Sequence, residues 1–517
     1  MNAQRWHGHA TKSAVVVGCT ALAMTVTGTT AQAHSPRDVA RQTLPANDGW
    51  AAYGTGTTGG AAADAEHVYT VTTWAEFRSA LEAGGSAPKI IKVRGTIDAV
   101  SEGCEAFAAP GYDFDAYLAA YAPEVWGLDT DLSAEPADSP EGLRRTSAAN
   151  QDKAIKVSVP ANTTIIGVGR NAGIKGASLQ IRAVDNVIIR NIAFESPIDC
   201  FPQWDPTDGS KGNWNSEYDT AVVYGSTHVW LDHNTFTDGS HPDSAAPTYF
   251  GMLYQQHDGE LDIVRGSNYV TASWNVFTEH DKTILIGNSD SESTAVGDRG
   301  KLKVTFHHNL FSKLVERAPR VRFGQVDSYN NHFVADASYS YSFGIGKESQ
   351  LVAQHNAFTL PAGVSAAKAL KKWSEAPVTA DGNHVNGKPV DLIAVHNAEI
   401  PAETLQSGAA GRPPCVPGRP REGRPRHRHR PGRRRRKSAA QGAPACPRPT
   451  SSSPCREGAS SWRAPGRAPP SGCRPAPSGR IPAGPSAASA PRPPDSPREP
   501  CTSTRADAVT TPASGTP

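Results

Sequence analysis

One short motif, an Asn followed by any residue and then Phe, constrains the fold of this chain more than any other feature. Its five copies begin at Asn234, Asn275, Asn309, Asn331 and Asn356, in steps of 41, 34, 22 and 25 residues. A Val stands five residues before the Asn in the first four copies, and Leu351 holds that place in the fifth. A minimum step near 22 residues with longer, variable steps predicts the coils of a solenoid that carry insertions.

Each copy also contains the alternation that is typical of a half-buried strand. In HVWLDHNTF, which starts at His228, the residues Val229, Leu231 and His233 alternate with Trp230 and Asp232. The same pattern places Trp274 and His308 beside their apolar partners in the next two copies, so we expect all three members of each set on the buried face. No convincing amphipathic helix separates the copies. The pattern therefore predicts an all-β parallel β-helix rather than a doubly wound sheet.

The repeated Asn follows each strand at a bend. Because Asn tolerates left-handed backbone geometry and bonds locally, we expect it to form the bend, and stacked copies could bond to one another as a ladder. Two upstream segments, NTTIIGVG and DNVIIRNIAF, predict earlier coils, the second with Asn191 followed by Phe194. The core then runs from no later than about Val68 to about Glu403 as one domain.

The N-terminus has the features of a secretory signal peptide. Arg5 and Lys12 precede a mostly apolar stretch, and Ala31-Gln32-Ala33 is a small-x-small cleavage site. We assign residues 1–33 to the signal peptide and expect a secreted, extracellular protein. In such an oxidising compartment the two cysteines of the core, Cys104 and Cys200, are expected to form a disulfide, with two unpaired thiols as the alternative.

The C-terminal part of the chain has a different composition from the domain at 34–407. Residues 411–517 hold 24 of the 42 Pro, 21 of the 52 Lys and Arg, and 5 of the 50 Asp and Glu. Their net charge is +16, and residues 1–410 carry −14. We interpret 408–517 either as a disordered basic tail or, preferably, as the translation of a shifted reading frame. The basic segment RPRHRHRPGRRRRK lacks interleaved aromatics, and we expect no nucleic-acid partner, no membrane anchor and a monomer.

Removing everything after Gly411 should leave activity and thermal stability nearly unchanged, because that stretch lacks apolar periodicity and cannot contribute to a packed core. Thermal unfolding and steady-state kinetics of the shortened chain test this expectation. A shortened chain that does not fold would show that the tail belongs to the domain.

Three carboxylates precede neighbouring coils. Asp219 lies in NSEYDTAVV, and Asp258 and Asp262 lie in QHDGELDIVRGSNYV. Successive coils stack about 4.8 Å apart, so these side chains would repel one another unless a cation lay among them. Oxygen ligands without Cys favour Ca²⁺ over zinc, and Glu217 is a candidate fourth ligand. Any one of these acids by itself would be a solvated loop residue.

Basic residues follow on the next coils. Lys282 in EHDKTILIG is expected to be exposed at the end of one coil, and Arg317 and Arg322 lie in ERAPRVRFG one coil further on. Arg320 alternates with Arg322, from which we expect different roles for the two. A cation site flanked by Lys and Arg is suited to an anionic polymer, with ordinary surface ion pairs as the alternative.

The stretch from Asn162 to Phe358 resembles the pectate lyases of polysaccharide lyase family 1. The motifs that carry the resemblance are HVWLDH, QHDGELDI, HDKTILIG and the Arg-x-Pro-x-x-Arg element of ERAPRVRFG. The resemblance implies a right-handed parallel β-helix and a calcium-dependent β-elimination of polygalacturonate (pectate). It further implies that Arg317 is the catalytic base and that Lys282 and Arg322 bind substrate. The implied Ca²⁺ ligands are Asp219, Asp258 and Asp262, with Glu217 at an accessory acidic position.

Arginine is an unusual base, because its pKa is about 12 or higher. We expect Ca²⁺, Lys282 and Arg322 to disfavour its charge and lower the pKa of Arg317, which predicts an alkaline optimum. Three other classes of protein share the solenoid. A polygalacturonase would need clustered catalytic Asp without the Arg element, a pectin lyase would replace the acids, and an adhesin would need no Lys282 and Arg317 pair.

Overall fold

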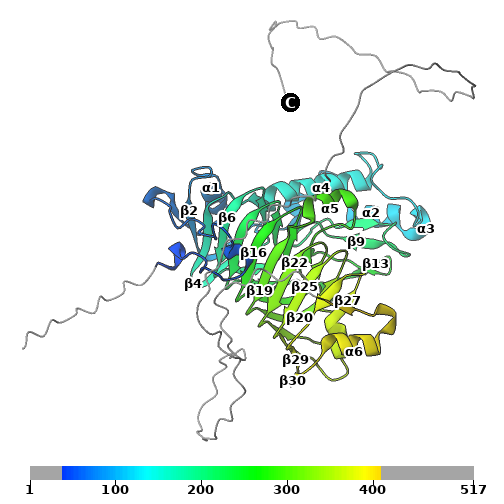
Figure 1. Ribbon diagram of the computed structural model, residues 1–517. Coiled ribbons are helices and arrows are strands. Elements are labelled where there is room, and N and C mark those ends of the chain that lie inside the picture. The colour runs from blue at the N-terminus through cyan, green and yellow to red at the C-terminus, as the bar shows by residue number, and fades with distance from the viewer. Residues whose placement is uncertain (1–37, 409–517) are drawn as a thin grey trace, which may run out of the picture. The chain divides into compact units, whose positions relative to one another are not determined.

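The computed structural model describes residues 38–408, shown in colour in Figure 1. The predicted signal peptide, 1–33, and all of the predicted tail after its first residue lie outside this part of the chain. Within it, no helix combines the length and the apolar character that crossing a membrane requires.

Short parallel strands arranged in three stacks make up the domain, as a parallel β-helix requires. The first stack is an eight-stranded sheet whose members, in spatial order, are β3 (Lys156–Ser158), β5 (Ser178–Arg182), β10 (Ala221–Tyr224), β15 (Leu261–Val264), β18 (Leu285–Ile286), β21 (Arg320–Val321), β24 (Phe343–Ile345) and β27 (Leu370–Lys372).

The other two stacks share one 19-stranded sheet, because the long strands β2 and β4 contribute to both. The second stack contains β1 (Val68–Val71), β2 (Lys89–Asp98), β4 (Thr163–Lys175), β6 (Asp185–Arg190), β11 (Thr227–Asp232), β16 (Asn268–Ser273), β19 (Lys303–His307), β22 (Gln325–Tyr329), β25 (Gln350–Gln354), β28 (Pro377–Thr379) and β31 (Gln406–Ser407). The third contains β7 (Ala193–Glu195), β12 (Thr235–Thr237), β17 (Val276–Lys282), β20 (Leu310–Glu316), β23 (His332–Val334), β26 (Ala357–Thr359) and β29 (His384–Val385), with β30 (Lys388–Pro389) paired antiparallel to β29.

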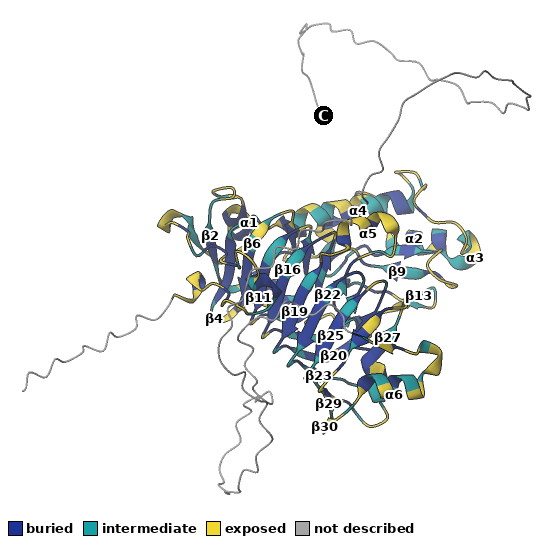
Figure 2. Cartoon of the chain, viewed as in Figure 1, coloured by how far each residue is buried: buried dark blue, intermediate teal, exposed yellow. Residues whose placement is uncertain are grey.

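The predicted repeat register is confirmed in the core of the coil. Val229 pairs with Val270, which continues through Val304 and Val326 to Leu351, and all five are buried. The Phe of each copy stacks on the next, with ring centroids 4.7–5.2 Å apart from Phe194 through to Phe358. Figure 2 shows these strands dark blue between more exposed connections. Because these apolar side chains are buried in rows, each copy keeps the same distance along the sequence from its Val or Leu to its Asn and Phe.

The Asn residues of the five copies form the predicted ladder, but the expectation that they form the left-handed bend is wrong for these copies and holds for Asn191, with φ of 58°. Each Asn Oδ1 accepts from the backbone N–H of the Asn one coil earlier at 2.9–3.0 Å, from Asn234 as far as Asn383. The left-handed residue is the one before each Asn, with φ of 56° at His233 and 58° at Trp274. The bend turns these side chains outward, so Trp274 is 52% exposed rather than buried as predicted.

Asn309→Leu should lower the free energy of unfolding by about 3–5 kcal/mol. The amide of Asn309 donates to the carbonyl of Ala272 and to Asn331, and its oxygen accepts twice from Asn275. An apolar side chain of similar size leaves these buried groups without partners. Denaturant unfolding measures the loss, and a loss below about 1 kcal/mol would show that the ladder contributes little.

Helices cover the outside of the coil, and the sequence missed most of them. They are α1 (Trp74–Glu82), α2 (Phe114–Tyr121), α3 (Pro123–Trp126), α4 (Pro140–Ile155), α5 (Glu292–Asp298) and α6 (Leu392–Glu399). The expectation of no helix between the copies is wrong for α5, which lies in the step from Asn275 to Asn309. The predicted disulfide between Cys104 and Cys200 is confirmed, and it ties the segment before α2 to the loop after β7.

Candidate active site

Two of the predicted carboxylates, Asp219 and Asp262, converge on one backbone position, Gly259, and the third, Asp258, directly precedes it in the chain. Asp219 lies two residues before β10, and its Oδ1 accepts from the Gly259 N–H at 2.9 Å. Asp262 lies in β15, and its Oδ1 accepts from the Leu285 N–H at 3.0 Å. A Cβ added to Gly259 would stand 2.5 Å from Asp262 Oδ1 and 2.8 Å from Asp219 Oδ1. Because glycine has no Cβ, it therefore leaves room for the carboxylate oxygens of two successive coils beside its Cα.

The electrostatics of these acids are those of crowded negative charge. Burial raises the pKa of Asp219 well above its usual value, and the charges of Asp262 and Asp258 raise it further. Burial and Asp258 raise the pKa of Asp262 to about 7. Like charges that share a site each disfavour the ionised form of the other, and a bound cation would relieve that repulsion.

Lys282 and Arg317 lie beside these acids, as predicted. Lys282 ends β17, pairs in register with Glu316 of β20, and places its Nζ 3.7 Å from Asp258 Oδ1. Its side chain is 15% exposed, so the expectation of an exposed Lys282 is wrong. Arg317 follows β20 with a left-handed φ of 61°, and its Nε donates to Glu316 Oε1 at 2.8 Å. The bend and the hydrogen bond together fix the guanidinium orientation.

In the metal-free site the pKa of Arg317 is raised, and the lowering expected with bound Ca²⁺ stays a prediction. Burial alone would lower the pKa, but the surrounding negative charges, first that of Glu316 and then those of Asp262 and Asp258, raise it above its usual value. In the metal-free site these acids outweigh the nearby positive charge of Arg320.

Arg320 begins β21 (Arg320–Val321) and Arg322 directly follows it, and the two side chains occupy separate environments. Arg322 donates from Nε to Asp290 Oδ1 at 2.8 Å and from Nη1 to the Gly287 carbonyl at 3.0 Å. The Arg320 guanidinium stacks on Trp373, with 3.9 Å from its carbon to the ring centroid. Different roles for the two are consistent with these partners. The structure does not place Arg322 in contact with the carboxylates.

Glu217 is associated with another buried acid rather than with the carboxylates at Gly259. It lies in the loop before β10, not on a strand, and its side chain is exposed. Its backbone N–H donates to Asp199 Oδ2 at 3.1 Å. Burial raises the pKa of Asp199 to about 7, and the charge of Glu217 contributes to that rise. An accessory ligand role for Glu217 therefore has no geometric support here.

A hard divalent cation fits the three predicted acids, Asp219, Asp258 and Asp262. Their oxygen donors, their mutual repulsion and the close approach at Gly259 all favour it.

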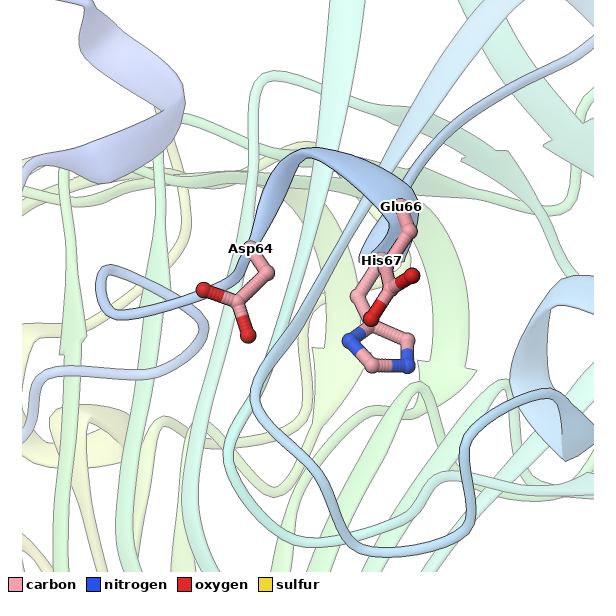
Figure 3. Close-up of side chains that lie close together, drawn as sticks. All are labelled: Asp64, Glu66 and His67. Carbon is pink, nitrogen blue, oxygen red and sulfur yellow. The ribbon is translucent and has the colours of Figure 1, made fainter.

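In the described part of the chain, a second group of possible metal ligands lies elsewhere. Asp64, Glu66 and His67 place one possible ligand atom each within 4.8 Å of one another on a single turn (Figure 3). Both of its acids are exposed, as solvated surface acids commonly are.

Two partners of the site escaped the sequence reasoning although they stand inside quoted motifs. Glu316 precedes Arg317 and orients it, and His280 precedes Lys282 and donates to the backbone of Asp258. The positions of Glu316 and His280 in the sequence do not by themselves indicate these hydrogen bonds. The only signal was their position beside residues with assigned roles.

Comparison with known proteins identifies relatives over most of the described domain. A family model described as "Pectate lyase" matches residues 20–109 and 136–404. A pectate lyase of Bacillus subtilis (strain 168) is 46% identical over 382 residues, which is 71% of this chain and 89% of the relative. A solved pectate lyase bound to a hexasaccharide is 44% identical, has a TM-score of 0.67, and aligns over 74% of this chain and 94% of its own. A structure solved to study the anti β-elimination mechanism of pectate lyase aligns with the same identity, coverage and TM-score.

Proposed function

The chain belongs to the pectate lyase family of polysaccharide lyases, and from this premise we propose that it is a secreted, calcium-dependent enzyme that cleaves (1→4)-α-D-galacturonan. The products would be 4,5-unsaturated oligogalacturonates. The observation that carries the proposal is the convergence of Asp219 and Asp262 on Gly259, with Lys282 and Arg317 beside them. The hexasaccharide bound by a relative and the β-elimination studied in another support the substrate class and the reaction.

The three carboxylates would hold Ca²⁺, which when bound withdraws charge from the uronate carboxylate of the substrate. Lys282, close to Asp258, would contribute a second positive charge to that carboxylate. The C5 proton of the uronate, which lies α to the carboxylate, becomes more acidic as a result. Arg322, fixed by Asp290, would bind a carboxylate further along the polymer.

Arg317 is proposed to remove the C5 proton. Its Nε is occupied by Glu316, which leaves the terminal nitrogens of the guanidinium to face the substrate. Arg317 would accept this proton as the neutral guanidine, and the electron pair of the C5–H bond becomes the second bond between C4 and C5. The C4–O bond breaks, its electron pair leaves with the glycosidic oxygen, and that oxygen takes up a proton from solvent. No water attacks the sugar, so the paired carboxylates of a glycoside hydrolase are not needed.

Polymers that differ only in their carboxylates test the proposed substrate. The enzyme should cleave polygalacturonate and leave a fully methyl-esterified galacturonan and a neutral galactan intact, because Ca²⁺, Lys282 and Arg322 all recognise free carboxylates. Size-exclusion chromatography of the digests measures cleavage. Equal cleavage of the esterified polymer would point to a pectin lyase, and binding without cleavage would point to an adhesin.

Stabilisation by Ca²⁺ should increase with pH. In the metal-free protein the carboxyl pKa of Asp262 rises from 3.8 to about 7, and that of Asp219 rises in the same direction. An acid with a raised pKa costs the folded state stability as pH rises from the ordinary value through the raised one, and bound Ca²⁺ offsets that cost. The rise in Tm at saturating Ca²⁺ should be larger at about pH 8 than at about pH 5. Equal rises measured by calorimetry would contradict this account.

A further inference from the structure

A buried group of acids and histidines lies next to Asp258, and the proposed chemistry does not use it. It combines residues from the loop after β12, the loop before β15, and β17. No member is more than 5% exposed, and the members are Asp238, Asp243, His257, Glu260 and His280. Titratable groups are seldom buried so completely unless each is paired.

His280 connects this group to the candidate site. Its Nδ1 is hydrogen-bonded to Asp238 Oδ1, and its Nε2 lies 2.6 Å from the backbone carbonyl oxygen of Asp258. The Asp258 carbonyl can only accept, so Nε2 donates to it, while Nδ1 pairs with Asp238.

The peptide group between Asp258 and Gly259 is held at both ends. Its carbonyl accepts from His280 Nε2 at 2.6 Å, and its N–H donates to Asp219 Oδ1 at 2.9 Å. The residue before Asp258 is anchored too, because His257 Nε2 lies 2.7 Å from the His241 carbonyl oxygen. Rotation of this one peptide would turn the Asp258 side chain and would also release Asp219 from Gly259.

We propose that His280 is a positioning residue for the calcium site. Its hydrogen bond to the Asp258 carbonyl holds the Asp258–Gly259 peptide in the orientation in which the side chains of Asp258 and Asp219 bind the same cation. Asp238 in turn orients the His280 ring through its hydrogen bond with Nδ1. The inference rests on the calcium-dependent function proposed above. It assigns His280 no contact with the substrate.

Two amide substitutions separate the two hydrogen bonds of the ring. In His280→Gln the amide nitrogen takes the place of Nε2 and can still donate to Asp258. In His280→Asn it takes the place of Nδ1 and reaches only Asp238. Calorimetric titration of metal-stripped proteins with CaCl₂ should show a Kd raised at least about tenfold for the Asn variant and within about threefold of wild type for the Gln variant, since only the Gln variant keeps the hydrogen bond to the Asp258 carbonyl. Activity that the Asn variant loses at low Ca²⁺ should return at high Ca²⁺.

Equal Kd values for wild type and the Asn variant would overturn the inference, as would equal weakening in both variants, which is what a merely structural role predicts. If the Asn variant does not fold, the Gln variant still decides, because a folded Gln variant with strongly weakened Ca²⁺ binding contradicts the role of the Nε2 donor. A wild-type protein that binds no Ca²⁺ would overturn the proposed calcium dependence itself, and the inference with it. Titration of wild type alone identifies that outcome.

Discussion

Arg317→Lys should lower kcat on polygalacturonate by at least about 10²-fold at saturating Ca²⁺, the low end for a positioned proton-transfer group. A lysine keeps the positive charge but cannot place its nitrogen where the guanidinium stands, and it cannot reproduce the hydrogen bond that orients Arg317 on Glu316. KM should change little, because the charge that faces the substrate is retained. Steady-state kinetics measure both constants.

Two further arginine variants serve as controls for that prediction. Arg322→Lys should raise KM more than it lowers kcat, because Arg322 is assigned a substrate-binding role and is held by Asp290. Arg299→Lys should change neither constant, since Arg299 pairs with Glu348 and Glu292 on the surface. If Arg317→Lys raises KM and leaves kcat intact, Arg317 only binds substrate, and the base must be another residue of the site.

Removal of Ca²⁺ should abolish turnover, and Asp262→Asn should lower kcat/KM by at least about 10³-fold, because a bound cation contributes several kcal/mol of transition-state stabilisation. Asp262 is the acid whose oxygen would stand nearest to a Cβ added at Gly259, and its charge acts on Arg317 as well. Activity assays with EDTA-treated enzyme, before and after CaCl₂ is restored, measure the effect.

The exposed group at Asp64 offers a matched control for the metal assignment. Asp64→Asn should leave both the calcium requirement and kcat/KM unchanged, because Asp64, Glu66 and His67 lie on one surface turn. Full activity after exhaustive chelation would contradict the metal assignment altogether. Loss of calcium dependence in Asp64→Asn with Asp262→Asn unaffected would move the cation to that turn.

The fold could be predicted from the repeat because the residues that recur in it are the buried ones. Val229 and its counterparts occupy one row on successive coils, so one spacing in the sequence became one register in space. The bend residues were not predictable in the same way. His233 and Trp274 read as the next members of the strand alternation, and only the left-handed turn shows that they face outward.

The acids, Lys282 and Arg317 were found because each belongs to a motif, and the structure brings them together. Their partners were not predictable, since the contacts join distant parts of the chain. Arg322 bonds to Asp290, 32 residues away, and His280 bonds to Asp238, 42 residues away. Helix α4 was missed because tertiary packing, which covers its buried face, outweighs a weak apolar pattern in the sequence.

The ratio of new double bonds to new reducing ends tests the central claim, elimination by a cation-dependent site, most directly. Ultraviolet absorbance counts the 4,5-unsaturated ends formed from polygalacturonate, and a reducing-sugar assay counts the chains cut. We predict one unsaturated end for each new reducing end with Ca²⁺, and neither product with EDTA. Reducing ends without double bonds would identify a hydrolase, and an undiminished yield of both products with EDTA would remove the cation from the mechanism.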